Sequence, residues 1–478
     1  MSTTPGRTAE VAAALAPYLE SWLDHQRRRA RVPGVQAAVR VGDRVVLDTA
    51  LGVADVDSGE PLTRRHLFRI ASHSKTFTAT VVLQLVEAGR LRLDDPVEVH
   101  VPGLRGSGLA GVTVRELLGH QGGVVRDGAD NDHWQLLQPF PDVERLTGIA
   151  VAEGAVLERN EHFKYSNIGY SLLGLVVEAV TGTGYREAVQ AAVVDRLGLA
   201  DTAPDWVPAR AAEYAAGHTG LLDGEDARLT VPHVDTGAMA AATGFTSTAR
   251  DLTTFGAAHF TGDGTLLGDG AKRLMRRPES EIRAHGNDPR YYGLGLDVRT
   301  IGERRLVGHS GGYPGHVTRT WIDPDGQVVV SVLTNAVDGP ADALARGVLA
   351  LLDLALAAPA DAPRHPAEEL RRYTGRFANL WGVTDVALLG DRLVLLHPDA
   401  PAPAEEHAEL TVEGPDTLRL ETVAGFGSPG ETLEYRWADD GTAASVRIGG
   451  ISAWPLEVFR TRRAAQVAGA AEAVRVAR

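Results

Sequence analysis

Residues 68–78 read Phe68-Arg69-Ile70-Ala71-Ser72-His73-Ser74-Lys75-Thr76-Phe77-Thr78. Apolar residues then recur at helical spacing as far as Gly89, which predicts a helix with Ser72 at its N-terminus and Lys75 one turn later on the same face. A serine hydroxyl is a poor nucleophile at neutral pH, and it needs a neighbouring base. The stretch therefore predicts a serine nucleophile with a lysine base, placed at the start of the central helix of the fold.

The use of lysine in the whole chain supports this interpretation. The sequence contains three lysines, Lys75, Lys164 and Lys272, so 45 of its 48 basic residues are arginine (48 − 3). Arginine stays protonated and cannot act as a base, whereas a buried lysine can lose its proton. Taken alone, however, Ser-x-x-Lys is more often a chance pattern on a solvated helix face.

Two further stretches of sequence make a chance Ser-x-x-Lys pattern less probable than a catalytic one. One is Phe163-Lys164-Tyr165-Ser166-Asn167-Ile168-Gly169-Tyr170, before an apolar helix, and the other is Gly308-His309-Ser310-Gly311-Gly312-Tyr313, between two runs typical of strands. In isolation, Tyr165 would more often be a core residue, Asn167 a turn residue and His309 a surface histidine. All three motifs occurring in this order make a chance origin improbable.

The three motifs together resemble those of the penicillin-recognising serine enzymes, which include class C β-lactamases, D,D-carboxypeptidases, D-aminopeptidases and β-lactamase-like esterases. The resemblance covers about residues 32–356. It implies that Ser72 carries the acyl group and that Lys75 is the base for acylation. It also implies that Tyr165 is a second proton carrier coupled to Lys75, and that Asn167 holds Lys75 and the substrate amide.

The third motif departs from the β-lactamase pattern. Class C β-lactamases have Lys-Thr-Gly where this chain has His309-Ser310-Gly311, so efficient β-lactamase activity is not expected. The resemblance implies that His309 protonates a substrate group or anchors its carboxylate near neutral pH. It places Ser310 and Gly311 at the substrate, and it assigns the oxyanion hole to the backbone N–H groups of Ser72 and Gly312.

The expected fold class is mixed α/β (α+β), with a β-lactamase/transpeptidase-like antiparallel sheet and a helical subdomain. The resemblance places the sheet strands at 35–41, 45–53 and around 304–335, and it places the helical subdomain between Ser72 and about Arg283. The segment 126–132 is expected to be a surface loop near the cleft.

The C-terminal region changes in character. We predict a first domain at 8–357, a Pro/Ala linker at 358–370, a small antiparallel β-barrel at 371–461 and a tail at 462–478. The barrel is predicted from short alternating strands separated by turn residues. Its first residues, Tyr373-Thr374-Gly375-Arg376-Phe377, resemble the lipocalin-like domains appended to this hydrolase family.

Composition narrows the function further. A net charge of −14 argues against a nucleic-acid partner or an anionic membrane surface, and the absence of cysteine excludes disulfides and thiolate nucleophiles. No His/Asp/Glu spacing typical of a metal site and no phosphate-binding glycine loop is seen, so no cofactor or metal is expected. The N-terminus lacks an apolar segment and no run approaches the ~20 residues of a membrane helix, so we expect a cytoplasmic protein.

These features together look like the penicillin-binding-protein-type thioesterases, which release and cyclise nonribosomal peptides. The resemblance implies a peptidyl thioester substrate with a D-residue at its acyl end, either free or presented by a carrier protein, and release by macrocyclisation or hydrolysis. The alternative is a cytosolic D-stereospecific aminopeptidase, or a carboxylesterase or weak β-lactamase, with the same site. A third interpretation, from another class, is a catalytically idle binding protein on this fold.

Overall fold

The computed structural model describes residues 5–283, 289–357, 366–400, 402–423 and 428–476. The chain divides into two compact units. One comprises residues 30–345, and the other combines residues 1–29 with residues 346–478. The site motifs all lie in the first unit.

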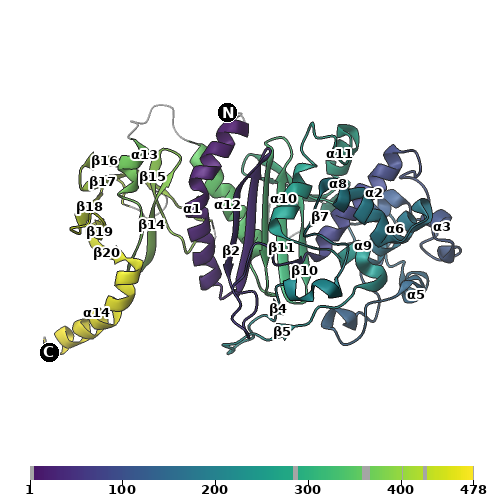
Figure 1. The fold of residues 1–478 in the computed structure, drawn as a ribbon, viewed down its shortest axis with the longest axis horizontal. Coiled ribbons are helices and arrows are strands. Elements are labelled where there is room, and N and C mark those ends of the chain that lie inside the picture. Colours follow the sequence, from purple (N-terminus) through teal and green to yellow (C-terminus); the bar gives the residue numbers. More distant parts are fainter. Residues whose placement is uncertain (1–4, 284–288, 358–365, 401, 424–427, 477–478) are drawn as a thin grey trace. The chain divides into compact units, whose positions relative to one another are not determined.

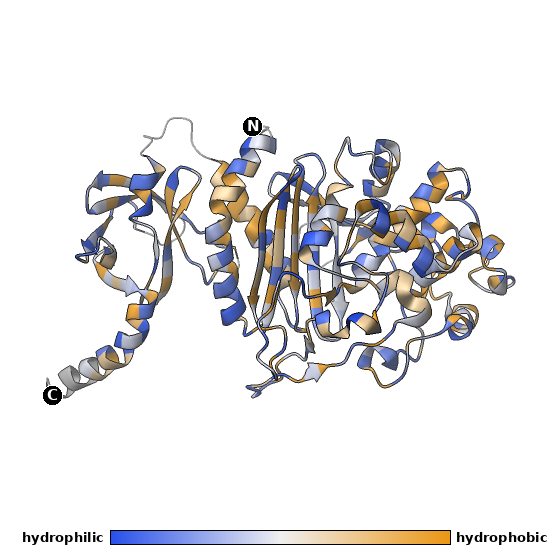
Figure 2. Ribbon diagram, viewed as in Figure 1, coloured by the Kyte–Doolittle hydropathy of each residue, from blue (hydrophilic) through white to orange (hydrophobic). Residues whose placement is uncertain are grey.

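The first unit is built on an eight-stranded antiparallel sheet (Figure 1). In spatial order its strands are β2 (Arg44–Gly52), β1 (Gly34–Val41), β12 (Val328–Thr334), β11 (His316–Asp323), β10 (Arg304–Tyr313), β9 (Asp297–Ile301), β8 (Arg290–Tyr292) and β7 (Ser280–Ile282). The central strand β12 reads Val-Val-Val-Ser-Val-Leu-Thr and is buried along its whole length, and hydrophobic residues run along the sheet strands in Figure 2. The predicted antiparallel sheet is therefore confirmed, and it brings the N-terminal hairpin beside strands almost 300 residues later.

Helices are the main regular structure between β2 and β7. They are α2 (Ser74–Glu87), α3 (Val97–His100), α4 (Val114–Leu118), α5 (Val143–Glu153), α6 (Asn167–Thr181), α7 (Tyr185–Val189), α8 (Asp195–Leu197), α9 (Ala240–Thr243), α10 (Ala249–Ala257) and α11 (Asp269–Arg276). Two short two-stranded sheets interrupt them, β3 (Phe68–Arg69) with β6 (Thr246–Ser247) and β4 (Gly217–His218) with β5 (Thr230–Val231). The helical subdomain is thus confirmed, although it is not wholly helical.

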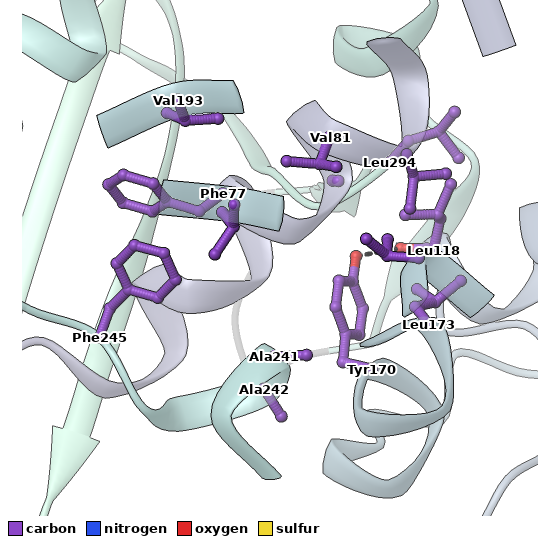
Figure 3. Close-up of a cluster of buried hydrophobic side chains, with 14 of the residues drawn as sticks. Phe77, Val81, Leu118, Tyr170, Leu173, Val193, Ala241, Ala242, Phe245 and Leu294 are labelled. Carbon is purple, nitrogen blue, oxygen red and sulfur yellow. Dashed lines mark hydrogen bonds between the residues drawn. The ribbon is translucent and has the colours of Figure 1, made fainter. Parts of the chain in front are cut away.

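Helix α2 is held at the centre of the helical subdomain by aromatic packing. The ring of Phe77 stacks on Phe245 and Phe255, with centroid distances of 4.2 and 3.8 Å, and Figure 3 shows the Phe77 and Phe245 rings beside α2. On the neighbouring α6, Tyr170 donates a hydrogen bond of 2.7 Å to the Leu118 carbonyl. Burial of a ring such as Phe77 contributes about 1.5–3 kcal/mol, so this packing fixes the helix that carries Lys75.

The second unit contains a closed barrel of eight strands, as the sequence predicts. In order they are β13 (Gly375–Asn379), β14 (Gly382–Leu389), β15 (Arg392–Leu396), β16 (Ala408–Gly414), β17 (Thr417–Val423), β18 (Thr432–Trp437), β19 (Ala443–Ile448) and β20 (Ile451–Pro455). Antiparallel pairing of β13 with β20 closes the barrel. Closure leaves no unpaired edge strand, which suits a small domain.

Two helices from distant parts of the sequence belong to the same unit as the barrel. In α1 (Pro5–Arg29), the Tyr18 hydroxyl donates a hydrogen bond to Asp385 on β14 at 3.1 Å, and the His25 ring lies 2.8 Å from the carboxylate of Asp399. In α12 (Ala341–Leu356), a Cβ on Gly347 would lie 2.2 Å from the Trp22 ring, so the two helices pack closely. Helix α1 and most of α12, which the sequence places in the first domain, therefore group with the barrel.

The ends of the predicted second domain differ in detail. Residues 358–365 of the predicted linker lie outside the described residues, and α13 (Ala367–Arg371) follows them. The barrel ends at Pro455, and α14 (Leu456–Val476) runs through the boundary predicted at 461/462. Within the described residues, no helix has both the length and the apolar character needed to cross a bilayer.

Candidate active site

Ser72 lies at a strained turn between β3 and α2. Strand β3 pairs with β6, and the Ile70 N–H donates to the Phe245 carbonyl at 2.9 Å. Ala71 then adopts a positive φ of 45°, a conformation that costs a non-glycine residue of order 1–3 kcal/mol. Ser72 sits in the 3₁₀ turn Ala71–His73, and the α-helix starts at Ser74. The predicted helix start is thus displaced by two residues, because the chain first makes a tighter turn.

Lys75 is fully buried and directed at the nucleophile. Its Nζ lies 2.7 Å from Asn167 Oδ1, 2.8 Å from the Ala242 carbonyl and 3.3 Å from Ser72 Oγ. Burial holds the pKa of Lys75 well below its ordinary value, the charge of Asp127 opposes this shift, and that of Arg126 adds to it. A neutral amine has two N–H donors and one lone pair. The two carbonyl oxygens accept the donors, so the lone pair faces the Ser72 hydroxyl.

Tyr165 contacts the same hydroxyl from the irregular segment just before α6. Its phenol donates to Ser72 Oγ at 2.8 Å, and Lys75 Nζ lies 4.7 Å from the centre of its ring. Burial raises the pKa of Tyr165, and the hydrogen bond with Ser72 only partly offsets this effect. Tyr165 is therefore a neutral phenol in this structure, which leaves Lys75 as the stronger base of the pair.

Asn167 is the first residue of α6 and connects Lys75 to a loop. Ser166 caps the helix, since its hydroxyl accepts from the Gly169 N–H at 2.8 Å. The Asn167 Oδ1 accepts from Lys75, and its Nδ2 donates to Asp127 Oδ1 at 2.7 Å. The structure therefore brings Ser72, Lys75, Tyr165 and Asn167 together, as their motifs predict.

His309 lies on β10, close to this group. Its ring centre is 6.5 Å from that of Tyr165. Nδ1 lies 2.6 Å from the Ser310 carbonyl, which can only accept, so Nδ1 carries the proton and Nε2 accepts from the Tyr292 hydroxyl at 2.9 Å. Burial and, to a smaller extent, the charge of Lys75 lower the pKa of His309 to about 3, so the imidazole is neutral near pH 7 in this structure. Its expected role, to protonate a substrate group or anchor a carboxylate, stays a prediction.

The two glycines after His309 have different surroundings. A Cβ on Gly311 would lie 2.1 Å from the Ile70 carbonyl, so glycine lets β10 approach the segment that leads to Ser72. A Cβ on Gly312 would meet nothing within 4 Å, and this residue faces open space. Ser310 has an exposed side chain. Close approach by the chain itself explains Gly311, whereas the substrate role of Ser310 and the oxyanion role of the Ser72 and Gly312 N–H groups remain predictions.

Two residues that the motifs do not include complete the site. Asp127 lies in the segment predicted as a surface loop, yet it is only 4% exposed and bonds to Asn167. Tyr292 of β8 donates its hydroxyl to Nε2 of His309, whose tautomer the Ser310 carbonyl fixes. An acidic residue next to an arginine in a glycine-rich loop is an ordinary surface pattern, so the sequence carried no signal for Asp127. Among the described residues, no group of three or more His, Cys, Asp or Glu side chains is placed to hold a metal ion.

Comparison with known proteins gives the family. The model of the Beta-lactamase family matches residues 19–355. Penicillin-binding protein 4* of Bacillus subtilis is 26% identical over 317 residues, which cover 63% of this chain and 67% of that protein. Protein flp of Staphylococcus aureus is 23% identical over 320 residues, which cover 66% of this chain and 62% of that protein.

Solved structures extend the similarity to the second unit. The structure of SurE matches with a TM-score of 0.60 and 27% identity, covering 95% of this chain and 100% of that one. The D-stereospecific amidohydrolase from Streptomyces sp. matches with a TM-score of 0.59 and 26% identity, covering 69% of this chain and 97% of that one. The family match spans well over half of the residues and includes all three motifs. The chain belongs to the Beta-lactamase family.

Proposed function

We propose that the protein is a penicillin-binding-protein-type thioesterase, which accepts a peptidyl thioester on Ser72 and releases it by macrocyclisation or hydrolysis. The observation that carries its chemistry is the pair of acceptors around Lys75, which leaves the amine lone pair directed at Ser72 Oγ. A catalytically idle binding protein would have no need of a buried lysine beside a strained serine.

The proposed reaction starts with transfer of the Ser72 proton to Lys75 as Oγ attacks the thioester carbonyl. The backbone N–H groups of Ser72 and Gly312 hold the oxyanion. Collapse of the tetrahedral intermediate breaks the C–S bond, and the thiolate leaves. Lys75 then releases the proton that it took from Ser72 to the solvent, where the thiolate takes it up, and Lys75 is neutral again. In the second half, the N-terminal amine of the same peptide attacks the acyl-enzyme. Lys75 takes a proton from this amine and returns it, with Tyr165, to Ser72 Oγ as the C–Oγ bond breaks, which completes the cycle with a new amide bond.

The comparisons support a D-configured acyl group. One SurE structure contains D-Leu and matches this chain at 26% identity, and an amidohydrolase match is D-stereospecific. SurE aligns over 95% of this chain and the penicillin-binding protein homologue from Pyrococcus abyssi over 91%, whereas the amidohydrolase aligns over 69%. The likeness to SurE thus includes the barrel unit, which is one of the features by which the sequence resembles the penicillin-binding-protein-type thioesterases.

A pocket beside Gly312 would receive the side chain of the acyl residue. It has a volume of about 470 Å³, and its wall includes Trp134, Leu136, Tyr313 and Val317. Trp134, Leu136 and Tyr313 of this wall also belong to an apolar cluster that contains Ala71, the neighbour of the nucleophile. Leu136 has a φ of 58°, which is unusual for a bulky side chain. These features favour an apolar acyl residue.

The test uses the purified full-length chain and three synthetic substrates. A linear peptidyl N-acetylcysteamine thioester ending in a D-residue should give mainly macrocycle by mass spectrometry. Its L-epimer should acylate Ser72 poorly. If the D-thioester gives only linear acid, the enzyme is a hydrolase and not a cyclase, and if a D-amino-acid amide is also cleaved faster than either thioester, the D-aminopeptidase or esterase alternative is correct.

A further inference from the structure

The loop that carries Asp127 is fixed to the first turn of α6. The Arg126 carbonyl accepts from the N–H groups of Asn167 and Ile168, at 2.9 and 3.1 Å, and the Val125 carbonyl accepts from the Ser166 hydroxyl at 2.6 Å. The first N–H groups of a helix have no partner within the helix, so this loop satisfies two of them. The attachment places Asp127 beside the Asn167 side chain.

The buried carboxylate of Asp127 has three neighbours. Its Oδ1 accepts from Asn167 Nδ2 at 2.7 Å and from Trp134 Nε1 at 3.0 Å, while Oδ2 lies 3.3 Å from Arg126 Nε. A carboxylate only accepts hydrogen bonds, so it determines that the Asn167 amide presents its NH₂ to Asp127 and its oxygen to Lys75. If the Asn167 amide were turned by 180°, its NH₂ would face the Lys75 amine. Lys75 would then lose one of its two hydrogen-bond acceptors.

We infer that Asp127 is a positioning residue for acylation, which orients Asn167 toward Lys75 and stabilises the ammonium that forms when Lys75 takes the Ser72 proton. This inference rests on the proposed acyl-enzyme function. An amine buried without any counter-charge would be a weak base, and general-base catalysis is most efficient when the base has a pKa near the working pH. Asp127 supplies a negative charge without itself touching the nucleophile.

Other charged or titratable groups face this pair and bear on its pH dependence. Arg126, His133 and Tyr165 face Asp127. Around Lys75 lie Arg126, His120 and His309, and burial holds both histidines neutral near pH 7 by lowering their pKa values. Because the histidines do not titrate in the neutral range, a shift of the Lys75 midpoint in an Asp127 variant reports on Asp127 itself.

The small number of lysines allows a direct test by NMR. Labelling with [¹³Cε]-lysine gives signals from Lys75, Lys164 and Lys272, and Lys75→Arg identifies the first. Asp127→Asn removes the charge and keeps the size of the side chain. Since an opposite charge at short range raises the pKa of a lysine by about one unit or more, the Lys75 titration midpoint should fall by at least about one pH unit in this variant.

The same variant changes the pH profile of acylation, measured with a p-nitrophenyl ester. Lys75 must be neutral to accept a proton, so activity is lost as pH falls through its pKa. Loss of the Asp127 charge lowers that pKa, so the acid limb of the profile should move to lower pH by the same amount as the NMR midpoint. The plateau rate should fall several-fold, because the base is weaker. A merely structural role would lower the rate at every pH and leave the limb in place.

Two further variants serve as controls. Asp132→Asn removes an exposed carboxylate from the same loop and should shift the midpoint by less than about 0.3 pH unit. Asp127→Glu keeps the charge but displaces it, and it should lower the rate while leaving the limb near its wild-type position. An unchanged Lys75 midpoint in Asp127→Asn would overturn the inference. Because NMR needs no substrate, the midpoint does not depend on whether the wild type accepts thioesters, and a failure to accept them would refute only the proposed function.

Discussion

The division of work between Lys75 and Tyr165 can be tested by comparing Lys75→Arg with Tyr165→Phe. Arginine cannot give up its proton, so it removes the base and leaves a cation near Ser72. Phenylalanine keeps the ring that lies 4.7 Å from Lys75 Nζ and removes the hydroxyl that donates to Ser72 Oγ. Lys75 is buried and Tyr165 is half-buried, so a thermal melt must first show that each variant folds.

The structure gives different magnitudes for the two changes. A positioned base contributes about 10²–10⁴ in rate, so Lys75→Arg should slow acylation by at least ~10². The Tyr165 hydroxyl makes one neutral hydrogen bond of 2.8 Å to Ser72, worth about 0.5–1.5 kcal/mol, which is up to roughly tenfold in rate. A thiolate leaves without a proton, because thiols ionise near pH ~8.5, whereas an amine must be protonated. Tyr165→Phe should therefore cost about tenfold on a thioester but at least ~10² on an amide.

Single-turnover acylation of the full-length protein measures these effects without interference from product release. The thioester and the amide should share one acyl group, so that only the leaving group differs. Retention of most activity by Lys75→Arg, together with a loss above ~10³ in Tyr165→Phe on the thioester, would refute the assignment. Tyr165 would then be the main base, despite the burial that disfavours its ionised form.

Three other outcomes are expected. Since His309 is neutral and cannot pair with a carboxylate as a lysine would, nitrocefin turnover should stay below about 10 per second, and a faster rate would contradict this view of the site. Leu136→Asn introduces a residue type that tolerates positive φ and makes the pocket wall polar. The kcat/KM preference for an apolar over a small acyl residue should therefore fall about tenfold. Leu137→Asn, at an exposed position outside the wall, should leave this preference unchanged. Phe77→Ala should lower the free energy of unfolding by about 3–5 kcal/mol in urea titrations, because it removes the stacked ring. The control is Trp381→Ala, at a residue that is 89% exposed, which should lower it by less than about 0.5 kcal/mol. Similar losses in both variants would show that the stacked rings do not stabilise α2.

Much of the fold was predictable from local patterns. The hairpin at 35–53, the strand pair around 304–335 and the alternating segments of the barrel have the period of strands, and the structure confirms the sheet and the closed barrel. Errors occurred at ends of elements. The last barrel strand stops at Pro455 because α14 begins there, and the α-helix after Ser72 begins two residues late because a 3₁₀ turn precedes it.

The sequence by itself determined which residues could carry the chemistry. A serine three residues before a lysine, a tyrosine two before an asparagine and a histidine before glycines are local patterns, and the small number of lysines marks Lys75. The protonation states and hydrogen bonds of these groups in the folded protein depended on burial and on partners distant in sequence. Asn167, 92 residues from Lys75, accepts a hydrogen bond from its amine, and Asp127 orients that asparagine.

Only the tertiary structure decided the protonation states. Burial disfavours the charged form of every ionisable group, so it favours the neutral amine of Lys75, which can accept a proton, and makes Tyr165 a weaker acid and His309 a neutral acceptor of the Tyr292 hydroxyl. The same histidine on a solvated strand would titrate near neutral pH, as the motif suggested. A residue's type can be seen in the sequence, but its charge depends on the surroundings that the fold gives it.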